Sequence, residues 1–82
     1  MYKLRASDGK NNLCGKNLKA IRKAQNPPIS QRKLAQKLQV MGYDVDNHFI
    51  RRIENGQRFV TDIEIQILAR ALNVTYDDLL ER

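Results

Sequence analysis

The chain has 82 residues, of which 41% are apolar and 29% charged, and its net charge of +6 is consistent with one small domain that has a modest core. Its longest apolar run, Ile67-Leu68-Ala69, is too short for a membrane span, and its single cysteine, Cys14, excludes an intramolecular disulfide. The first ten residues lack the apolar run of a secretion signal, so we expect a cytoplasmic protein.

Residues 1–11 show no apolar periodicity and contain the turn-forming pair Asp8-Gly9. We interpret this segment as a flexible or loosely docked N-terminal arm, followed by one domain over residues 12–82. From residue 13 to residue 25 the pattern is helical, with one face formed by Leu13, Cys14, Leu18, Ile21 and Ala24. Asn26-Pro27-Pro28 ends this helix, because a residue before proline avoids the α conformation.

Two further helices are predicted on either side of a turn. Ser30 is a good N-cap for a helix that runs to about Met41, and Gly42 can adopt the positive φ that terminates it. Asp46 is the expected N-cap of the next helix, which Gly56 ends.

The last third of the chain predicts two more helices. Thr61 and Glu64 have the spacing of a capping box, and the helix that follows is apolar almost all round until Asn73. Such a helix should be central or should have a second apolar partner. Thr75 caps a short final helix that contains Leu79 and Leu80. No strand alternation appears, so the fold class is all-α with five short helices.

The third predicted helix has two different faces. With Asn47 set at zero and about 100° per residue, Arg51, His48 and Arg52 lie within roughly 140°. The opposite arc, from roughly 200° to 340°, carries Phe49, Ile53, Ile50 and Glu54. This division is typical of a helix that rests on a core and faces a polyanion, although an ordinary solvated basic face gives the same pattern.

Positive charge is concentrated in the first half of the chain. Residues 1–40 contain ten Lys/Arg and one acidic residue, whereas residues 41–82 contain five Arg and eight acidic residues. The basic half can neutralise phosphates, but it could equally bind an acidic protein or an anionic membrane surface.

The order of these features resembles the phage repressor and Cro-type helix-turn-helix family, also called the xenobiotic-response-element family. The resemblance covers residues 13–81 and rests on Gly15-Lys16-Asn17-Leu18, Ile21-Arg22, Ile29-Ser30-Gln31, Leu34-Ala35, Leu38, Ile50, Arg52 to Gly56, Ile67, Ala69, Leu72, Val74 and Leu79-Leu80. It implies a compact five-helix, lambda-repressor-like domain. One departure is that Ile50 lies twelve positions after Leu38, about five more than the usual short turn requires, so we expect a lengthened connection between the second and third helices.

The resemblance also implies which residues contact DNA. Asn47, His48 and Arg52 match base-reading positions, and Arg51 between them reaches a base or a phosphate. The expected phosphate contacts are Gln31, Arg32, Asn55, Gln57 and Arg58. Arg32 has an equally plausible role as a plain solvated cation.

A different role is implied for Arg22 and Glu54, which both fall near apolar faces. In the family this pair resembles a partly buried ion pair that joins the first helix to the end of the third. We expect the same pair in this chain.

Catalytic and metal sites are not indicated. The only histidine, His48, has no cysteine or second histidine at metal-ligand spacing. Cys14 is placed as a small core residue, and no glycine loop suited to phosphates occurs. We therefore expect neither an enzyme nor a cofactor nor a metal.

The leading hypothesis is a bacterial or phage transcriptional regulator, most simply a repressor, that binds a double-stranded DNA operator with its third helix in the major groove. Apolar residues in excess on the last two helices, among them Ile65, Tyr76 and Leu80, allow a homodimer or complete a monomer core. The alternative is an antitoxin or another protein-interaction module with the same fold, whose main partner is a protein such as a toxin and whose DNA binding is secondary. No membrane partner is expected.

Overall fold

The computed structural model describes residues 5–81, and within this range the regular structure consists of five helices. Their bounds are α1 (Cys14–Ala24), α2 (Gln31–Val40), α3 (Asn47–Glu54), α4 (Asp62–Leu72) and α5 (Tyr76–Leu80). The predicted all-α class and the predicted number and order of helices are confirmed.

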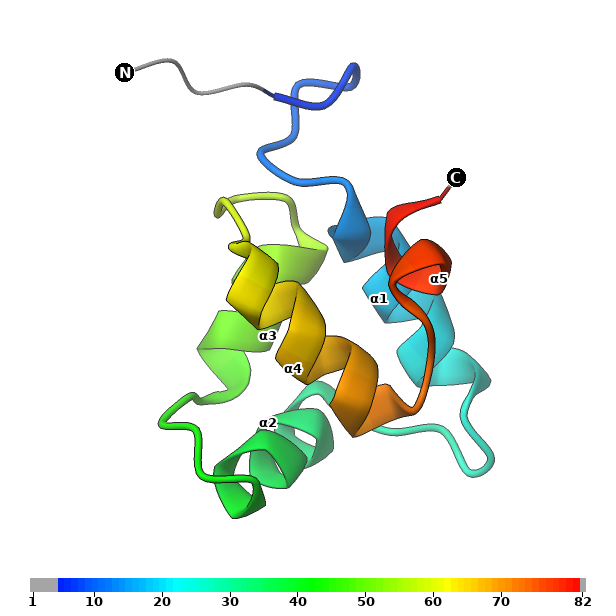
Figure 1. Cartoon of the computed structure of the whole chain (residues 1–82), viewed down its shortest axis with the longest axis vertical. Coiled ribbons are helices and arrows are strands. Elements are labelled where there is room, and N and C mark those ends of the chain that lie inside the picture. Colours follow the sequence, from blue (N-terminus) through cyan, green and yellow to red (C-terminus); the bar gives the residue numbers. More distant parts are fainter. Residues whose placement is uncertain (1–4, 82) are drawn as a thin grey trace.

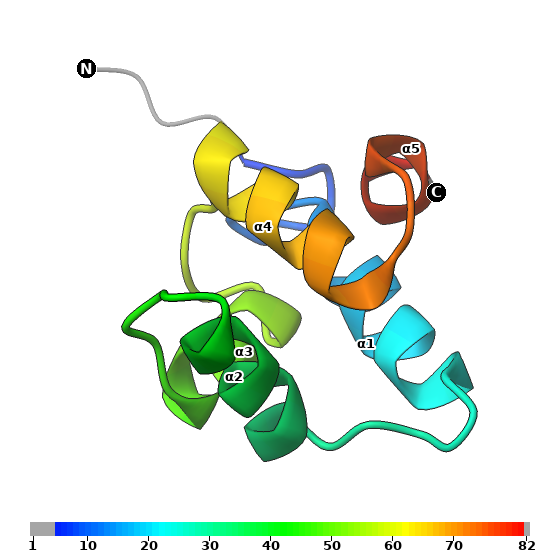
Figure 2. The same cartoon turned by 60° about the horizontal axis from the view of Figure 1, so that its bottom comes forward.

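The helices pack around α4, which lies between the α2–α3 pair and the α1–α5 pair in both Figure 1 and Figure 2. α4 contacts α1, α2 and α5, while α2 packs on α3 and α1 packs on both α3 and α5. The shared core consists of fully buried aliphatic side chains from all five helices, including Leu18, Leu34, Leu38, Ile50, Ile53, Leu68 and Leu79. The apolar sequence of α4 predicted that this helix would be central or would have a second apolar partner, and its contacts with three other helices agree with the first alternative.

Four of the predicted helix starts are closed by side-chain caps. The Ser30 hydroxyl accepts from Lys33 N at 3.0 Å, and the Asp46 carboxylate accepts from Phe49 N at 3.1 Å. Reciprocal capping boxes begin α4 (Thr61 with Glu64) and α5 (Thr75 with Asp78). Each cap satisfies an otherwise unpaired backbone N–H and contributes about 1 kcal/mol.

The ends of the helices differ slightly from the sequence prediction. α1 begins at Cys14, so Leu13 precedes the helix and is 49% exposed, and Ala24 is exposed at its other end. Both residues were wrongly assigned to the buried face, because the core does not extend to either end of α1. α2 ends at Val40, one residue before the predicted Met41.

The predicted lengthened connection between α2 and α3 is present over residues 41–46. Gly42 has φ +101°, in the left-handed region that suits glycine. Gln39 Nε2 donates to Val45 O at 2.7 Å, and Tyr43 N donates to Leu38 O at 3.0 Å. These two bonds fasten the longer turn to the end of α2.

α1 and α3 lie in tight contact at Gly15. This residue is buried, and a Cβ there would overlap the carbonyl oxygen of Ile53. Only glycine lets the first turn of α1 lie against the last turn of α3 at this separation. The contact sets how the C-terminal end of α3 is held.

Candidate nucleic-acid interface

One face of α3 is buried in the structure and the other is largely exposed. Ile50 and Ile53 are fully buried against the core, and Glu54 is also buried. On the other side His48, Arg51 and Arg52 are exposed, and Asn47 at the start of the helix is half-buried. The buried residues fix the helix to the domain while the exposed ones point to solvent.

The exposed side of α3 carries groups suited to reading base edges. An arginine can donate two hydrogen bonds to guanine O6 and N7, and an asparagine can pair with adenine N6 and N7. A shallow hollow lies beside this side of the helix, between α3 and the lengthened turn, and is lined by Gln39, Asp44, Val45, Asp46, His48, Phe49, Arg52 and Arg58. The longer turn therefore borders the surface on which the candidate base-reading residues lie.

Arg22 and Glu54 are brought together in the interior. Arg22 Nε lies 2.7 Å from Glu54 Oε2, and Arg22 Nη2 donates to Glu54 Oε1 at 2.9 Å. Their side chains are 9% and 1% exposed, and Arg22 Nη1 also donates to Ile29 O at 2.8 Å. The hydrogen bonds from Arg22 to Glu54 raise the pKa of Arg22 above its usual value. This two-bond pair joins α1 to the end of α3.

Gln31 lies closer to this pair than the sequence suggested. Its side-chain Nε2 donates to Glu54 Oε1 at 3.0 Å, and the residue is half-buried at the start of α2. Gln31 was predicted to contact a phosphate, and in this structure its side-chain amide nitrogen is directed inward to Glu54. Arg32, next along α2, is exposed.

The α3–α4 loop, residues 55–61, contains the other candidate phosphate contacts. Asn55 and Gln57 are exposed, whereas Arg58 turns toward the protein. Arg58 Nη2 lies 2.6 Å from Glu64 Oε2, its Nε donates to Phe59 O, and its guanidinium carbon lies 4.7 Å from the centre of the Phe49 ring. Arg58 therefore links α3, the loop and α4, and only the exposed third of its side chain is open to a phosphate.

The sequence did not predict that residues before α1 hold this loop in place. Lys10, Asn11 and Asn12 precede α1 and donate hydrogen bonds to the backbone of residues 53–58. No local pattern indicates this contact, because the donors and acceptors lie more than forty positions apart.

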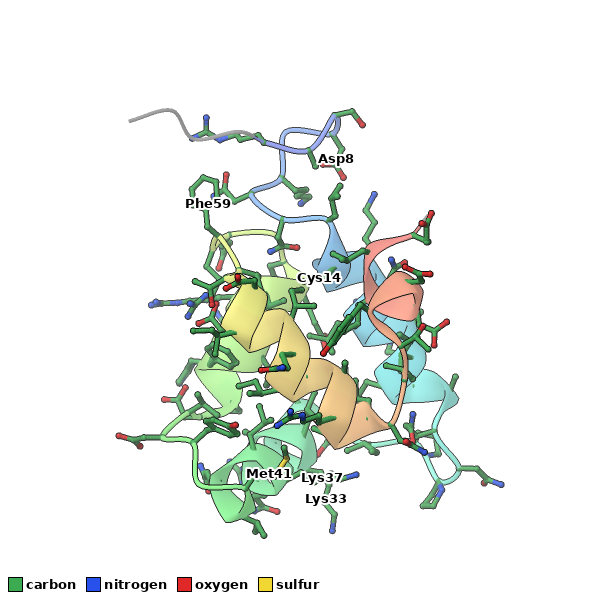
Figure 3. All side chains as sticks on the ribbon, viewed as in Figure 1. Asp8, Cys14, Lys33, Lys37, Met41 and Phe59 are labelled. Carbon is green, nitrogen blue, oxygen red and sulfur yellow. The ribbon has the colours of Figure 1, made fainter. Side chains whose placement is uncertain are left out.

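Cys14 is the first residue of α1, where Figure 3 labels it, and it is buried in the core with 1% exposure. Burial raises the pKa of its thiol from 9.0 to about 11, because the thiolate loses hydration there. Its placement in the core agrees with the role expected from sequence.

The raised pKa of Cys14 predicts that alkaline pH lowers the free energy of unfolding. At pH 9.0 half of the unfolded thiol is ionised, whereas the folded thiol still keeps its proton. Its contribution to stability is fully present below about pH 9 and is lost as the pH rises through about 11. Urea unfolding of the wild type and of Cys14→Ala across this window measures the effect. The free energy of unfolding of Cys14→Ala should fall less steeply with rising pH than that of the wild type. Equal slopes for the two proteins would contradict a role for the thiol.

Among residues 5–81, no group of three or more His, Cys, Asp or Glu side chains is arranged to hold a metal ion. No helix in the same range is long and apolar enough to cross a membrane.

Comparison with known proteins identifies the family. A family model described as "Helix-turn-helix" matches residues 18–79, which is well over half of the chain and spans most of α1, all of α2 to α4, and α5 up to Leu79. Searches of curated proteins and of solved structures gave no match. The chain therefore belongs to the helix-turn-helix family, as its resemblance to the phage repressor and Cro-type members predicted.

Proposed function

We propose that this protein is a sequence-specific DNA-binding transcriptional regulator, most simply a repressor, that inserts α3 into the major groove of its operator. The observation that carries the proposal is the division of α3. Its exposed side bears His48, Arg51 and Arg52, while Ile50 and Ile53 fix the opposite side to the core. Membership of the helix-turn-helix family supports DNA binding in general, because this is a regulatory and not a catalytic family.

The proposed contacts divide into two kinds. Asn47, His48, Arg51 and Arg52 read base edges from α3. The phosphate contacts flank them, with Arg32 and the start of α2 on one side and the α3–α4 loop on the other. Gln31 would contribute its backbone N–H at the positive end of the α2 dipole, since its side chain donates to Glu54. In the loop, Asn55 and Gln57 have exposed side chains, and Arg58 would use its exposed edge.

We further propose a homodimer formed through α4 and α5. Ile63, Tyr76 and Leu80 are 66%, 51% and 41% exposed, and together with Ile65 they line a shallow, mainly apolar hollow. In a single chain Ile65 packs against the core but Ile63, Tyr76 and Leu80 stay exposed, so a second copy could cover them. A two-fold dimer would present two α3 helices to half-sites about 34 Å apart on the same face of the duplex.

A protein-interaction module, such as an antitoxin, is the second candidate. It is favoured by the acidic side chains at α5, because Asp77 and Asp78 of this helix and Glu81 directly after it are exposed next to Tyr76 and Leu80. An acidic surface with apolar side chains suits a basic protein partner. In this case DNA binding would be weak or secondary.

The dependence of DNA affinity on salt distinguishes the two candidates. For a duplex enriched from a random pool and a scrambled duplex, affinity is measured across a range of salt concentrations. A DNA regulator should prefer the enriched duplex, with log affinity falling against log salt by about 0.9 for each phosphate neutralised. Weak binding that does not distinguish the two duplexes would favour the protein-interaction module.

A further inference from the structure

The segment before α1 is fastened to the loop that follows α3. In Figure 1 the two lie at the same end of the molecule, and in Figure 3 Asp8 of the segment and Phe59 of the loop both lie at that end. Five backbone carbonyl oxygens, one in the last turn of α3 and four in the loop, accept hydrogen bonds from this segment. They belong to Ile53, Asn55, Gly56, Gln57 and Arg58.

Asn12 makes the central contacts of this junction. Its side-chain Nδ2 donates to Ile53 O at 3.1 Å and to Arg58 O at 2.8 Å, so one amide group bridges the two sides of the turn. Its Oδ1 accepts from Gly15 N at 2.8 Å, in the first turn of α1. All the hydrogen-bonding groups of this side chain thus serve to join α1, the end of α3 and the loop.

Asn11 and Lys10 extend the junction along the loop. Asn11 N donates to Gly56 O and Asn11 Nδ2 to Gln57 O, both at 2.9 Å. Lys10 Nζ donates to Asn55 O at 3.3 Å. The stem of Lys10 packs on Gly56, where φ is +72° and a Cβ would come within 2.5 Å of Lys10 Cδ. The loop is shaped to receive the segment at this point.

Contacts within the segment and an ion pair with α1 also hold the segment in place. Arg5 Nε donates to Asn11 Oδ1 at 2.9 Å, and Asp8 accepts from Lys10 N at 3.0 Å. Asp8 also pairs with Lys16 of α1 at 3.1 Å. The described part of the expected arm, residues 5–11, is therefore docked on the domain.

We propose that residues 10–12 position the α3–α4 loop for DNA binding, with Asn12 as the main positioning residue. The inference rests on the proposed function, in which Asn55 and Gln57 of this loop contact one flank of the half-site. A loop that is already ordered loses less conformational entropy when it binds. The bonds from Asn12 supply this order without any contact between Asn12 and DNA.

The test compares Asn12→Ala with Asn17→Ala. Asn17 provides a matched control, because its Nδ2 also donates to two carbonyl oxygens, but these belong to Leu79 and Glu81 near α5. Two quantities are measured on folded protein of the same oligomeric state: amide hydrogen exchange in residues 55–58 and affinity for the enriched duplex.

For Asn12→Ala we expect faster exchange in the loop and a Kd raised about 3- to 10-fold. The slope of affinity against salt should stay unchanged, because no cation is removed. Asn17→Ala should leave both the loop exchange and the Kd at their wild-type values. If Asn12→Ala does not fold, Asn11→Ala removes only one side-chain bond to the loop and should shift both quantities in the same direction, by less.

Two results would overturn the inference in different ways. If the wild-type protein prefers the enriched duplex and Asn12→Ala binds it with the same Kd, the segment does not position the loop. A wild-type protein that selects no duplex would remove the proposed function and this inference together. The selectivity of the wild type tests the proposed function, and the affinity of the variant tests the inference, so the two failures can be told apart.

Discussion

Replacing Arg22 with methionine is expected to lower the free energy of unfolding by about 3–5 kcal/mol. The substitution leaves the Glu54 carboxylate, whose side chain is 1% exposed, without its two-bond partner. Gln31 still donates one hydrogen bond to Glu54, but it carries no charge to offset that of the carboxylate. Urea or thermal unfolding at neutral pH measures the loss.

An exposed ion pair in the same chain provides the control. Lys16 pairs with Asp8 at a similar distance, 3.1 Å, but its side chain is 76% exposed. Because water screens this pair, Lys16→Met should change stability by only about 0–1 kcal/mol. If Arg22→Met costs no more than Lys16→Met, the buried pair does not hold α1 to α3.

Replacing Arg52 with alanine is expected to weaken binding to the preferred duplex about 10- to 100-fold. Arg52 is exposed on α3, and a two-bond contact with a base contributes about 1–3 kcal/mol of discrimination. The preference should be relaxed at one position of each half-site, while binding to the scrambled duplex changes much less. Fluorescence anisotropy with the two duplexes measures both effects.

Arg70→Ala is the matched control for Arg52→Ala. Arg70 is also exposed and has the same charge, but it lies on α4. Its loss should leave the base preference intact. Were Arg52→Ala to lower affinity for all sequences equally and to reduce the salt slope by about one, Arg52 would contact a phosphate and not a base.

The local features of the fold could be predicted from sequence. Ser30, Asp46, Thr61 and Thr75 cap their helices with hydrogen bonds to backbone N–H groups only three positions away. Such contacts depend on short-range geometry that a residue type and its spacing encode. Asn73 likewise ends α4 in the left-handed conformation, with φ 56°.

The exposed and buried faces of α3 could also be predicted from sequence, because the helical period alone separates Arg51 and Arg52 from Ile50 and Ile53. The Arg22–Glu54 pair spans 32 positions, and only the family resemblance pointed to it. Its two-bond geometry and the contact with Gln31 required the three-dimensional arrangement of α1, α2 and α3.

The remaining features depend on how separate helices and loops pack against one another. Arg58 remains a predicted phosphate contact, but its ion pair with Glu64 and its contact with the Phe49 ring were not foreseen from sequence. Asn12 received no role, because its carbonyl partners lie 41 and 46 positions away. Leu13 was placed inside although it precedes α1 and is half exposed. In each case the position of another element decides the outcome.

Selection of sites from a random duplex pool tests most directly the claim that α3 reads a DNA sequence. The wild type and Arg52→Ala are carried through the selection side by side at ~100 mM salt, where specific complexes of this kind persist. We predict that the wild type enriches one site, with two-fold symmetry and half-sites about one helical turn apart, and that the variant loses this enrichment at the position that Arg52 reads. No enrichment by the wild type would contradict the claim and favour a protein partner.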